Sequence, residues 1–231
     1  MPEWLYILRT GLGLMCAMAA VPGVVRAAPV VLCEEAAQFA AEQTGVPLSI
    51  LQAVTLAETG QTKFDRNKFA PWPWAVQSGA KGNWFPDSRS AIAFTRQLTA
   101  QGISNIDIGC FQLNLRWHAE AFENLEDMFS PKNNALYAAA FLQRLYQQTG
   151  DWRAAVGRYH SRDDERAESY LQRLETIFET YLADSPPGPA QMRSAALPQA
   201  VSAPQKFGLV FARGPLLQSP IHPRPIIGGS P

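Results

Sequence analysis

Apolar and small residues recur at helical spacing over most of residues 30–182, and polar residues fill the positions between them. This periodicity predicts six helices, at 34–43, 48–58, 88–100, 134–148, 151–160 and 166–182. Glycines follow several of these segments, as is typical where helices end: Gly45, Gly60, Gly102 and Gly150. The pattern therefore predicts a mainly α domain.

One segment between the predicted helices has the pattern of strands. Residues 75–77 and 83–85 flank the glycine-containing turn 78–82, which predicts a small β-hairpin and is the only clear strand signal. Large aromatic residues surround it: Phe69, Trp72, Trp74, Trp84 and Phe85. Such residues either fill the core or line a groove that stacks against sugar rings, and the sequence leaves both open.

The first 27 residues have the organisation of a signal peptide. Arg9 precedes an apolar stretch over 11–25, and residues 25–27 form a small-residue cleavage site, so cleavage after Ala27 is expected. The stretch is interrupted at Pro22 and falls short of the ~20 residues that a spanning helix needs. We expect export to the periplasm without stable membrane insertion; a retained anchor is the alternative.

The last 47 residues differ in composition from the rest. Residues 185–231 contain ten prolines and five glycines and no acidic residue, a composition typical of disorder. One domain at 28–184 remains, large enough to bury a core. The apolar islands 207–211 and 221–227 are either docking segments for a partner or parts of a spacer.

Charge and cysteine content exclude several functions. Lys plus Arg and Asp plus Glu both number 20, so no basic stripe for nucleic acid is expected. Export leaves Cys33 and Cys110, and a disulfide closing this loop of 77 residues would stabilise the fold by roughly 4 kcal/mol. Two buried free thiols are the alternative. The three histidines are scattered, so no metal site is expected.

Glu58 is the candidate catalytic residue. Ile50, Leu51 and Val54 form an apolar stripe that Glu58 continues, so its carboxyl is expected to face the core or a cleft. Desolvation and the negative end of the helix dipole both raise the pKa of such a carboxyl, as suits a general acid/base near neutral pH. The alternative is a partly exposed helix-end glutamate, or one paired with an arginine.

Three segments, in this order, carry a specific resemblance. Residues 51–59 end in Ala-Glu-Thr, residues 107–114 follow the pattern Asp-x-Gly-x-x-Gln-x-Asn, and residues 155–159 are Ala-Val-Gly-Arg-Tyr. Together they resemble the soluble lytic transglycosylases, which share a goose-lysozyme-like fold, and the resemblance covers roughly residues 30–182. The Pro-Trp-Pro-Trp-Ala stretch at 71–75 is similar to small members that accompany flagella and secretion systems.

The resemblance implies roles for individual residues. It makes Glu58 the single catalytic acid/base, places Gln112 and Asn114 in a cleft-lining motif, and makes Tyr159 the tyrosine that supports the glutamate. Without the resemblance, Gln112 and Asn114 could equally satisfy backbone groups in a turn, and Tyr159 could be a core tyrosine.

Several positions depart from the family pattern, among them Asn133 and Asn134, which only partly match an Asn-Ile motif that precedes a helix in relatives. Thr59 stands where serine is usual and keeps the hydroxyl, and Phe111 replaces a methionine that contacts a substrate acetamido group. His160 follows the tyrosine where asparagine is typical. Asp87 and Asp107 are left out of the catalytic set.

The family cleaves the β-1,4 bond between N-acetylmuramic acid and N-acetylglucosamine in peptidoglycan and leaves a 1,6-anhydro product. The resemblance thus implies glycan strands as substrate, no cofactor, and service to a flagellum or secretion system. A component of that machine is the partner expected if residues 185–231 are a docking segment and not a spacer. Two alternatives stay open. One is a muramidase of the same fold, in which water is the nucleophile, and the other is a non-catalytic assembly protein that binds peptidoglycan.

Overall fold

The structure is a computed structural model, which describes Met1 and residues 29–62 and 69–181. The signal peptide and the tail predicted from the sequence lie outside the described residues. Within the described part of the chain, no helix has the length and apolar character required to cross a membrane.

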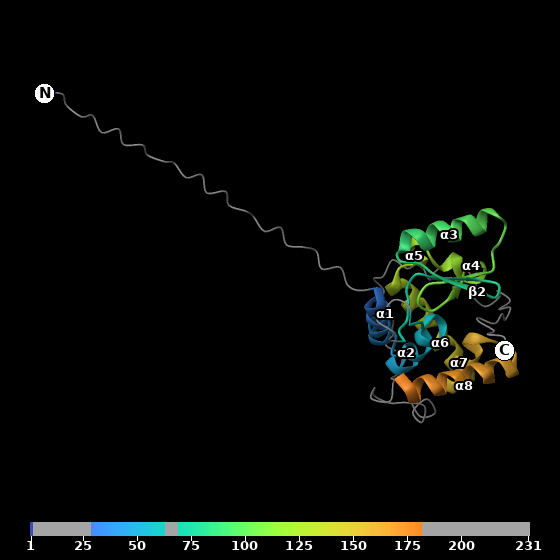
Figure 1. The fold of residues 1–231 in the computed structure, drawn as a ribbon. Helices are drawn as coiled ribbons and strands as arrows, with labels where there is room; N and C mark the ends of the chain where they lie inside the picture. Colours follow the sequence, from blue (N-terminus) through green and yellow to red (C-terminus); the bar gives the residue numbers. More distant parts are fainter. Residues whose placement is uncertain (2–28, 63–68, 182–231) are drawn as a thin grey trace.

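The described residues form a mainly helical domain with a small antiparallel sheet (Figure 1). The long helices are α1 (Pro29–Thr44), α2 (Leu48–Thr59), α3 (Ser88–Ala100), α6 (Pro131–Thr149), α7 (Trp152–His160) and α8 (Asp164–Tyr181). Short helical turns fill the span between the sheet and α6: α4 (Leu115–His118), the 3₁₀ turn η1 (Ala119–Ala121) and α5 (Leu125–Met128). All six predicted helices are confirmed, and the short turns were not predicted.

The sheet has four strands in the order β2-β1-β3-β4. These strands are β1 (Ala75–Ser78), β2 (Lys81–Trp84), β3 (Ile106–Ile108) and β4 (Leu113–Asn114). The predicted hairpin is confirmed as β1 and β2, but its turn is shorter than the predicted 78–82, because Ser78 pairs with Lys81. The prediction of a single hairpin was wrong, since β3 pairs with both β1 and β4.

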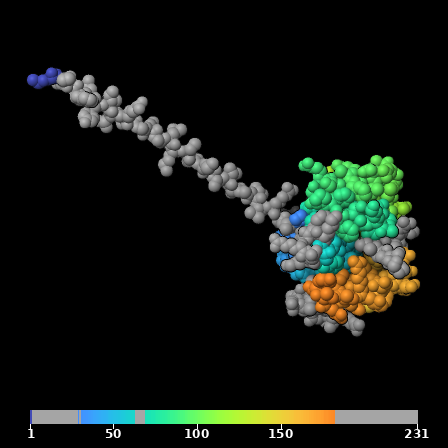
Figure 2. Space-filling model, in the orientation of Figure 1, coloured from blue at the N-terminus to red at the C-terminus, as the bar shows by residue number. Residues whose placement is uncertain are grey.

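Helix α2 lies at the centre of the helical part. Ten of its twelve residues are buried, and it packs against α1 and α8. Helix α1 runs along α6, and buried alanines such as Ala36, Ala40, Ala135 and Ala139 let the two backbones approach closely. Figure 2 shows α8 (orange) on the surface opposite α3 (green), so the sheet and α3 form one end of the domain and α8 the other.

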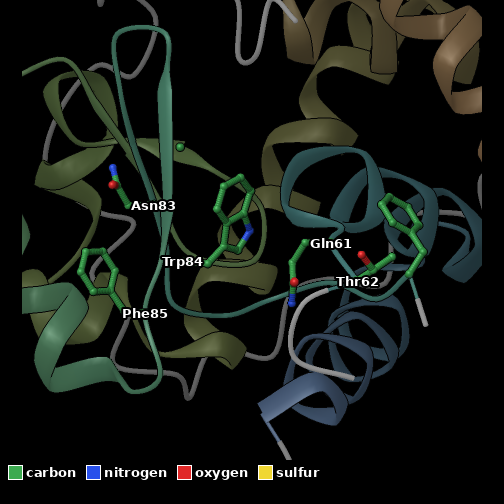
Figure 3. A pocket seen from close by; sticks show the side chains of 7 residues that line it. Gln61, Thr62, Asn83, Trp84 and Phe85 are labelled. Carbon is green, nitrogen blue, oxygen red and sulfur yellow. The ribbon is translucent and has the colours of Figure 1, made fainter. Parts of the chain in front are cut away.

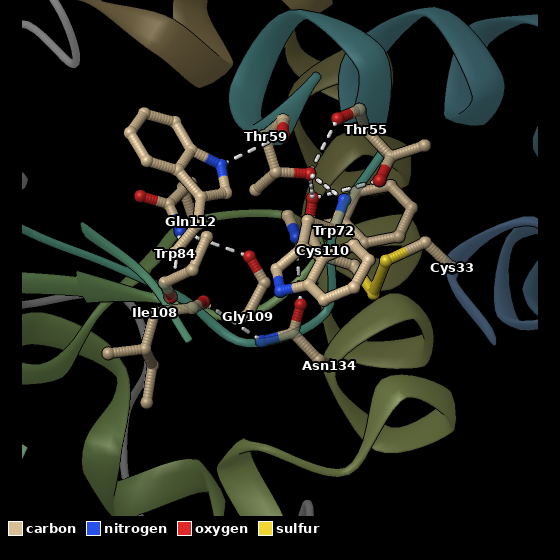
Figure 4. The surroundings of a disulfide bond; sticks show 12 residues. Cys33, Thr55, Thr59, Trp72, Trp84, Ile108, Gly109, Cys110, Gln112 and Asn134 are labelled. Carbon is tan, nitrogen blue, oxygen red and sulfur yellow. Dashed lines mark hydrogen bonds between the residues drawn. A yellow bond between two sulfur atoms is a disulfide. The ribbon is translucent and has the colours of Figure 1, made fainter. Parts of the chain in front are cut away.

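The turn between β3 and β4 is tied to three helices (Figure 4). Cys110 forms a disulfide with Cys33 of α1, with the two Cα atoms 5.6 Å apart, so the predicted pairing is confirmed. The Thr55 hydroxyl of α2 donates to the Cys110 carbonyl at 2.9 Å. Asn134 of α6 accepts from the Phe111 amide at 2.9 Å and donates to the carbonyls of Ile108 and Met128. The sheet is therefore fixed to the helices at this turn.

Gly109 is required at the start of this turn for two reasons. Its φ is +81°, which side chains rarely adopt, and an added Cβ would lie 2.5 Å from Asn134 Nδ2. Gly79 in the hairpin turn has φ +64° but nothing within 4 Å of an added Cβ. The two glycines thus share the backbone constraint and differ in the steric one.

We expect Gly109→Ala to destabilise the protein more than Gly79→Ala does. Backbone strain alone should make Gly79→Ala cost about 1–2 kcal/mol. Gly109→Ala adds the displacement of Asn134 and the loss of its hydrogen bonds. Urea denaturation of both variants measures the difference. Equal free energies of unfolding would contradict the role of Asn134 as the anchor of this turn.

Candidate active site

The Glu58 carboxyl is enclosed at the end of the central helix. Glu58 is the last but one residue of α2 and is 2% exposed, continuing the buried stripe that the sequence predicted. Its Oε1 accepts a hydrogen bond from the Tyr170 hydroxyl of α8 at 2.7 Å. This burial does not match the alternative of an exposed helix-end glutamate.

Burial raises the pKa of Glu58 to about 8. The Tyr170 hydrogen bond and the positive charge of Arg173 act in the opposite direction, and the charge of Asp107 adds to the rise. Desolvation is the largest of these contributions. The carboxyl is therefore mostly protonated at neutral pH, which is the state that a general acid requires.

Two aromatic rings of α7 and α8 lie beside this carboxyl. The His160 ring stacks on the Tyr170 ring with centroids 4.1 Å apart and planes 3° from parallel. His160 Nδ1 is 4.0 Å from Glu58 Oε1. Burial, followed by the charges of Arg173 and Arg166, lowers the pKa of His160 to about 4, so at neutral pH this contact is not an ion pair.

Tyr159 lies close to this group but bonds elsewhere. Its hydroxyl donates to the Phe111 carbonyl at 2.7 Å, and burial, together with the charge of Glu58, holds its pKa well above the ordinary value. Tyr170, rather than Tyr159, donates to Glu58 in this structure. Tyr159 thus connects α7 to the turn between β3 and β4.

The amides of the 107–114 motif are engaged with the protein itself. Gln112 has φ +45°, and its side chain donates to the carbonyls of Gly109 at 3.0 Å and Ala75 at 3.3 Å. Asn114 donates to Asp107 Oδ1 at 2.7 Å and accepts from the Arg116 amide, capping α4. In the described structure these two side chains stabilise the sheet and its turn.

The two remaining predicted site residues are also enclosed. Phe111 is 0% exposed and packs in the core. Thr59 is 1% exposed, and its hydroxyl donates to the Thr55 carbonyl at 3.0 Å and accepts from the Trp72 amide at 3.0 Å. Thr59 therefore ties the end of α2 to the chain that leads into the hairpin.

A pocket opens next to the end of α2. It has a volume of about 670 Å³ and is lined by three aromatic residues, two amides, a threonine and a glycine: Gln61, Thr62, Phe69, Gly82, Asn83, Trp84 and Phe85. Figure 3 shows Trp84 of β2 facing Gln61, which follows α2. The Trp84 indole N–H donates to the Thr59 carbonyl at 3.1 Å, so this wall of the pocket is attached to the Glu58 helix.

The aromatic residues around the hairpin divide between the two interpretations that the sequence left open. Trp72 is 3% exposed and belongs to the core, and its indole N–H donates to the Phe85 carbonyl at 2.7 Å. Phe69, Trp84 and Phe85 line the pocket. Glu58 does not line it, although Gln61 stands only three residues further along the chain.

The structure brings some predicted site residues together and separates others. Glu58 and Tyr159 lie near one another, whereas Gln112 and Asn114 serve the sheet. The sequence did not point to Tyr170, which bonds directly to Glu58. Tyr170 belongs to an apolar stripe with Leu171 and Leu174, so periodicity alone marks it as a core residue.

No group of three His, Cys, Asp or Glu side chains in the described residues is arranged to hold a metal ion.

Comparison of the chain with family models, with curated proteins and with solved structures finds no match. The geometry around Glu58 is therefore the basis for any functional proposal.

We expect Glu58→Gln to stabilise the protein relative to the parent at alkaline pH. A carboxyl whose folded pKa is raised from 4.5 to about 8 contributes fully below about pH 4.5, and its contribution is lost as pH rises through about 8. Between about pH 4.5 and pH 8 the parent should therefore lose stability relative to Glu58→Gln, because glutamine at position 58 does not ionise. Urea denaturation at several pH values measures this difference.

Glu126→Gln provides the matched control, because Glu126 is a half-exposed surface residue paired with Arg96. A constant difference in stability between parent and Glu58→Gln over the whole window would show that the Glu58 carboxyl titrates normally.

Proposed function

We propose that this protein is a peptidoglycan lytic transglycosylase with a goose-lysozyme-like fold. It cleaves the β-1,4 bond between N-acetylmuramic acid and N-acetylglucosamine and leaves 1,6-anhydromuramic ends. The observation that carries the proposal is the Glu58 carboxyl, which burial keeps protonated near neutral pH at the end of the helix that borders an aromatic pocket.

One carboxyl performs both proton transfers in this mechanism. Glu58 protonates the leaving glycosidic oxygen, and the resulting carboxylate takes the proton of the muramic 6-hydroxyl as that oxygen attacks the anomeric carbon. The substrate's own acetamido group steadies the positive charge on that carbon. A glycosidase with two catalytic acids needs a second carboxyl at a defined separation, and the buried Asp107 is instead bonded to Asn114.

The lyase and a muramidase differ in the nucleophile that the site must accept. A muramidase must place a water molecule next to the anomeric carbon, whereas a transglycosylase uses a hydroxyl that the substrate brings with it. Glu58 is 2% exposed, so the environment that raises its pKa also excludes water. For the same reason, the glycan must displace the groups that cover Glu58 when it binds.

The aromatic pocket supplies a binding surface for the glycan. Sugar rings have apolar faces that stack on aromatic side chains, and their hydroxyl and acetamido groups pair with amides. Trp84 and Phe85 offer rings, and Asn83 and Gln61 offer amides, in one pocket. The hydrogen bond from the Trp84 indole N–H to the Thr59 carbonyl fixes the position of this surface relative to the end of α2.

The proposed place of action is the periplasm, where peptidoglycan lies. The Cys33–Cys110 disulfide is typical of exported proteins and agrees with this address. Within the family, the proposal extends to local wall remodelling during assembly of a flagellum or secretion system. This narrower role is based on the sequence of residues 71–75 and on the tail at 185–231.

Glu58→Gln should lower the rate of wall cleavage by at least about 100-fold, because the amide cannot donate or accept the proton in transit. Digestion of purified sacculi followed by mass spectrometry of the soluble products measures it, with Glu126→Gln as the control that retains activity. Products one water lighter than reducing sugars are expected from the parent.

Reducing ends that carry added water would instead support the muramidase. Equal solubilisation by parent and Glu58→Gln would favour a non-catalytic protein that binds peptidoglycan.

Trp84→Ala should weaken glycan binding by about tenfold, equivalent to ~1.4 kcal/mol, because one stacking face is lost from the pocket. Calorimetry with a soluble peptidoglycan fragment measures this in the Glu58→Gln background, where turnover is blocked. Trp84→Phe keeps a ring and loses only the N–H bonded to Thr59, so most of the affinity should remain. Unchanged affinity in Trp84→Ala would remove this pocket from the substrate path.

A further inference from the structure

His160 has a buried nitrogen without a partner beside the proposed catalytic carboxyl. Its side chain is 7% exposed, and within the described residues Nδ1 forms no hydrogen bond. This atom lies 4.0 Å from Glu58 Oε1, the oxygen that already accepts from Tyr170. A buried polar atom without a partner is uncommon in folded proteins and requires an explanation.

The orientation of the ring is fixed by its neighbour. His160 stands at the end of α7, and its ring lies parallel to that of Tyr170 at 4.1 Å. In this stack, Nδ1 of one ring lies 4.0 Å and the hydroxyl of the other 2.7 Å from the same carboxylate oxygen. Oε2 of Glu58 has no such arrangement around it in the described contacts.

We propose that His160 is a positioning residue that forms, with Tyr170, a two-donor clamp on Glu58 Oε1. Its neutral ring carries the proton on Nδ1, and Nδ1–H closes to hydrogen-bond distance as negative charge develops on the carboxyl. This inference rests on the proposed function. The clamp leaves Oε2 as the atom that carries the acid proton and transfers it to the leaving oxygen.

The clamp acts differently on the two states of Glu58. A hydrogen bond from a neutral donor to a carboxylate is stronger than one to a protonated carboxyl, so both donors stabilise the charged state more. That state forms only after Glu58 has given up its proton, and interactions made chiefly at that point lower the barrier. His160 therefore acts on the reaction through Glu58 and without contact with the glycan.

Burial, followed by the charges around the ring, keeps His160 neutral. The titratable and charged groups around it come from three helices: Glu58 from α2, Tyr170, Arg166 and Arg173 from α8, and Tyr159 from α7 itself. Asp107 of β3 acts on Glu58 and Tyr159. The two arginines disfavour a second positive charge on the ring. Changes in rate near pH 8 therefore report on Glu58, because the pKa of His160 is about 4 and burial raises that of Asp107 only to about 6.

Two substitutions separate the donor from the ring. His160→Phe keeps the stack on Tyr170 and removes Nδ1, whereas His160→Asn loses the ring but carries an amide N–H at the position of Nδ1. Both are compared with the parent as the full exported chain, acting on a soluble peptidoglycan tetrasaccharide, with folding checked by circular dichroism. His160→Phe should lower kcat about 10- to 100-fold with little change in KM.

The pH profile provides a readout that a purely structural role would not change. In His160→Phe the alkaline limb of kcat should move to higher pH, because the Glu58 carboxylate has lost a donor. In His160→Asn, kcat and the pH of the alkaline limb should both be close to the values of the parent. A His160→Phe enzyme with parental kcat and profile overturns the clamp, and so does His160→Asn with the defects of His160→Phe.

A measurement without substrate separates the clamp from the proposed function. NMR titration of the Glu58 carboxyl should give a higher pKa in His160→Phe than in the parent, and a parental value in His160→Asn. Identical titration of all three proteins overturns the clamp even if Glu58→Gln abolishes activity. If Glu58→Gln leaves activity intact, the proposed function fails, and the titration still decides whether His160 donates to Glu58.

Discussion

The enclosure of the Glu58 carboxyl is the constraint on which the site depends. A carboxyl that is 2% exposed stays protonated because burial removes the water that would solvate its charge, and the hydrogen bond from Tyr170 offsets this effect only in part. The central position of α2 produces this enclosure, since α1 and α8 pack against it. Any change that admits water to the end of α2 would therefore alter the chemistry before it altered the fold.

A second group of contacts connects the sheet to this helix. The turn at Gly109 is held by Cys33, Thr55 and Asn134, which come from three different helices. At the end of α2, the Thr59 hydroxyl accepts a hydrogen bond from the Trp72 amide, and the Thr59 carbonyl accepts one from the Trp84 indole N–H. The hairpin that lines the pocket is thus attached one residue away from Glu58. Gln112 of the 107–114 motif holds the same hairpin at the start of β1, through its bond to the Ala75 carbonyl.

The sequence predicted those features that local pattern determines. The helix at 88–100 and the buried stripe ending in Glu58 follow from long periodic segments, and both are present as predicted. Strands β3 and β4 have three and two residues, too few for a period to appear, so the sheet was underestimated. Tyr170 stands 112 residues from Glu58, and only tertiary packing brings its hydroxyl to the carboxyl.

The same surroundings shift the pKa values of Glu58 and His160 in opposite directions and keep both groups neutral. Burial is the largest influence on both, raising the pKa of the acid to about 8 and lowering that of the imidazole to about 4. Arg173 favours the charged form of Glu58 and the neutral form of His160, so it opposes burial at one group and reinforces it at the other. Transfer of the proton from Glu58 to His160 would create two buried charges beside an arginine. The pair therefore keeps its proton on the carboxyl, where a glycosidic oxygen can take it.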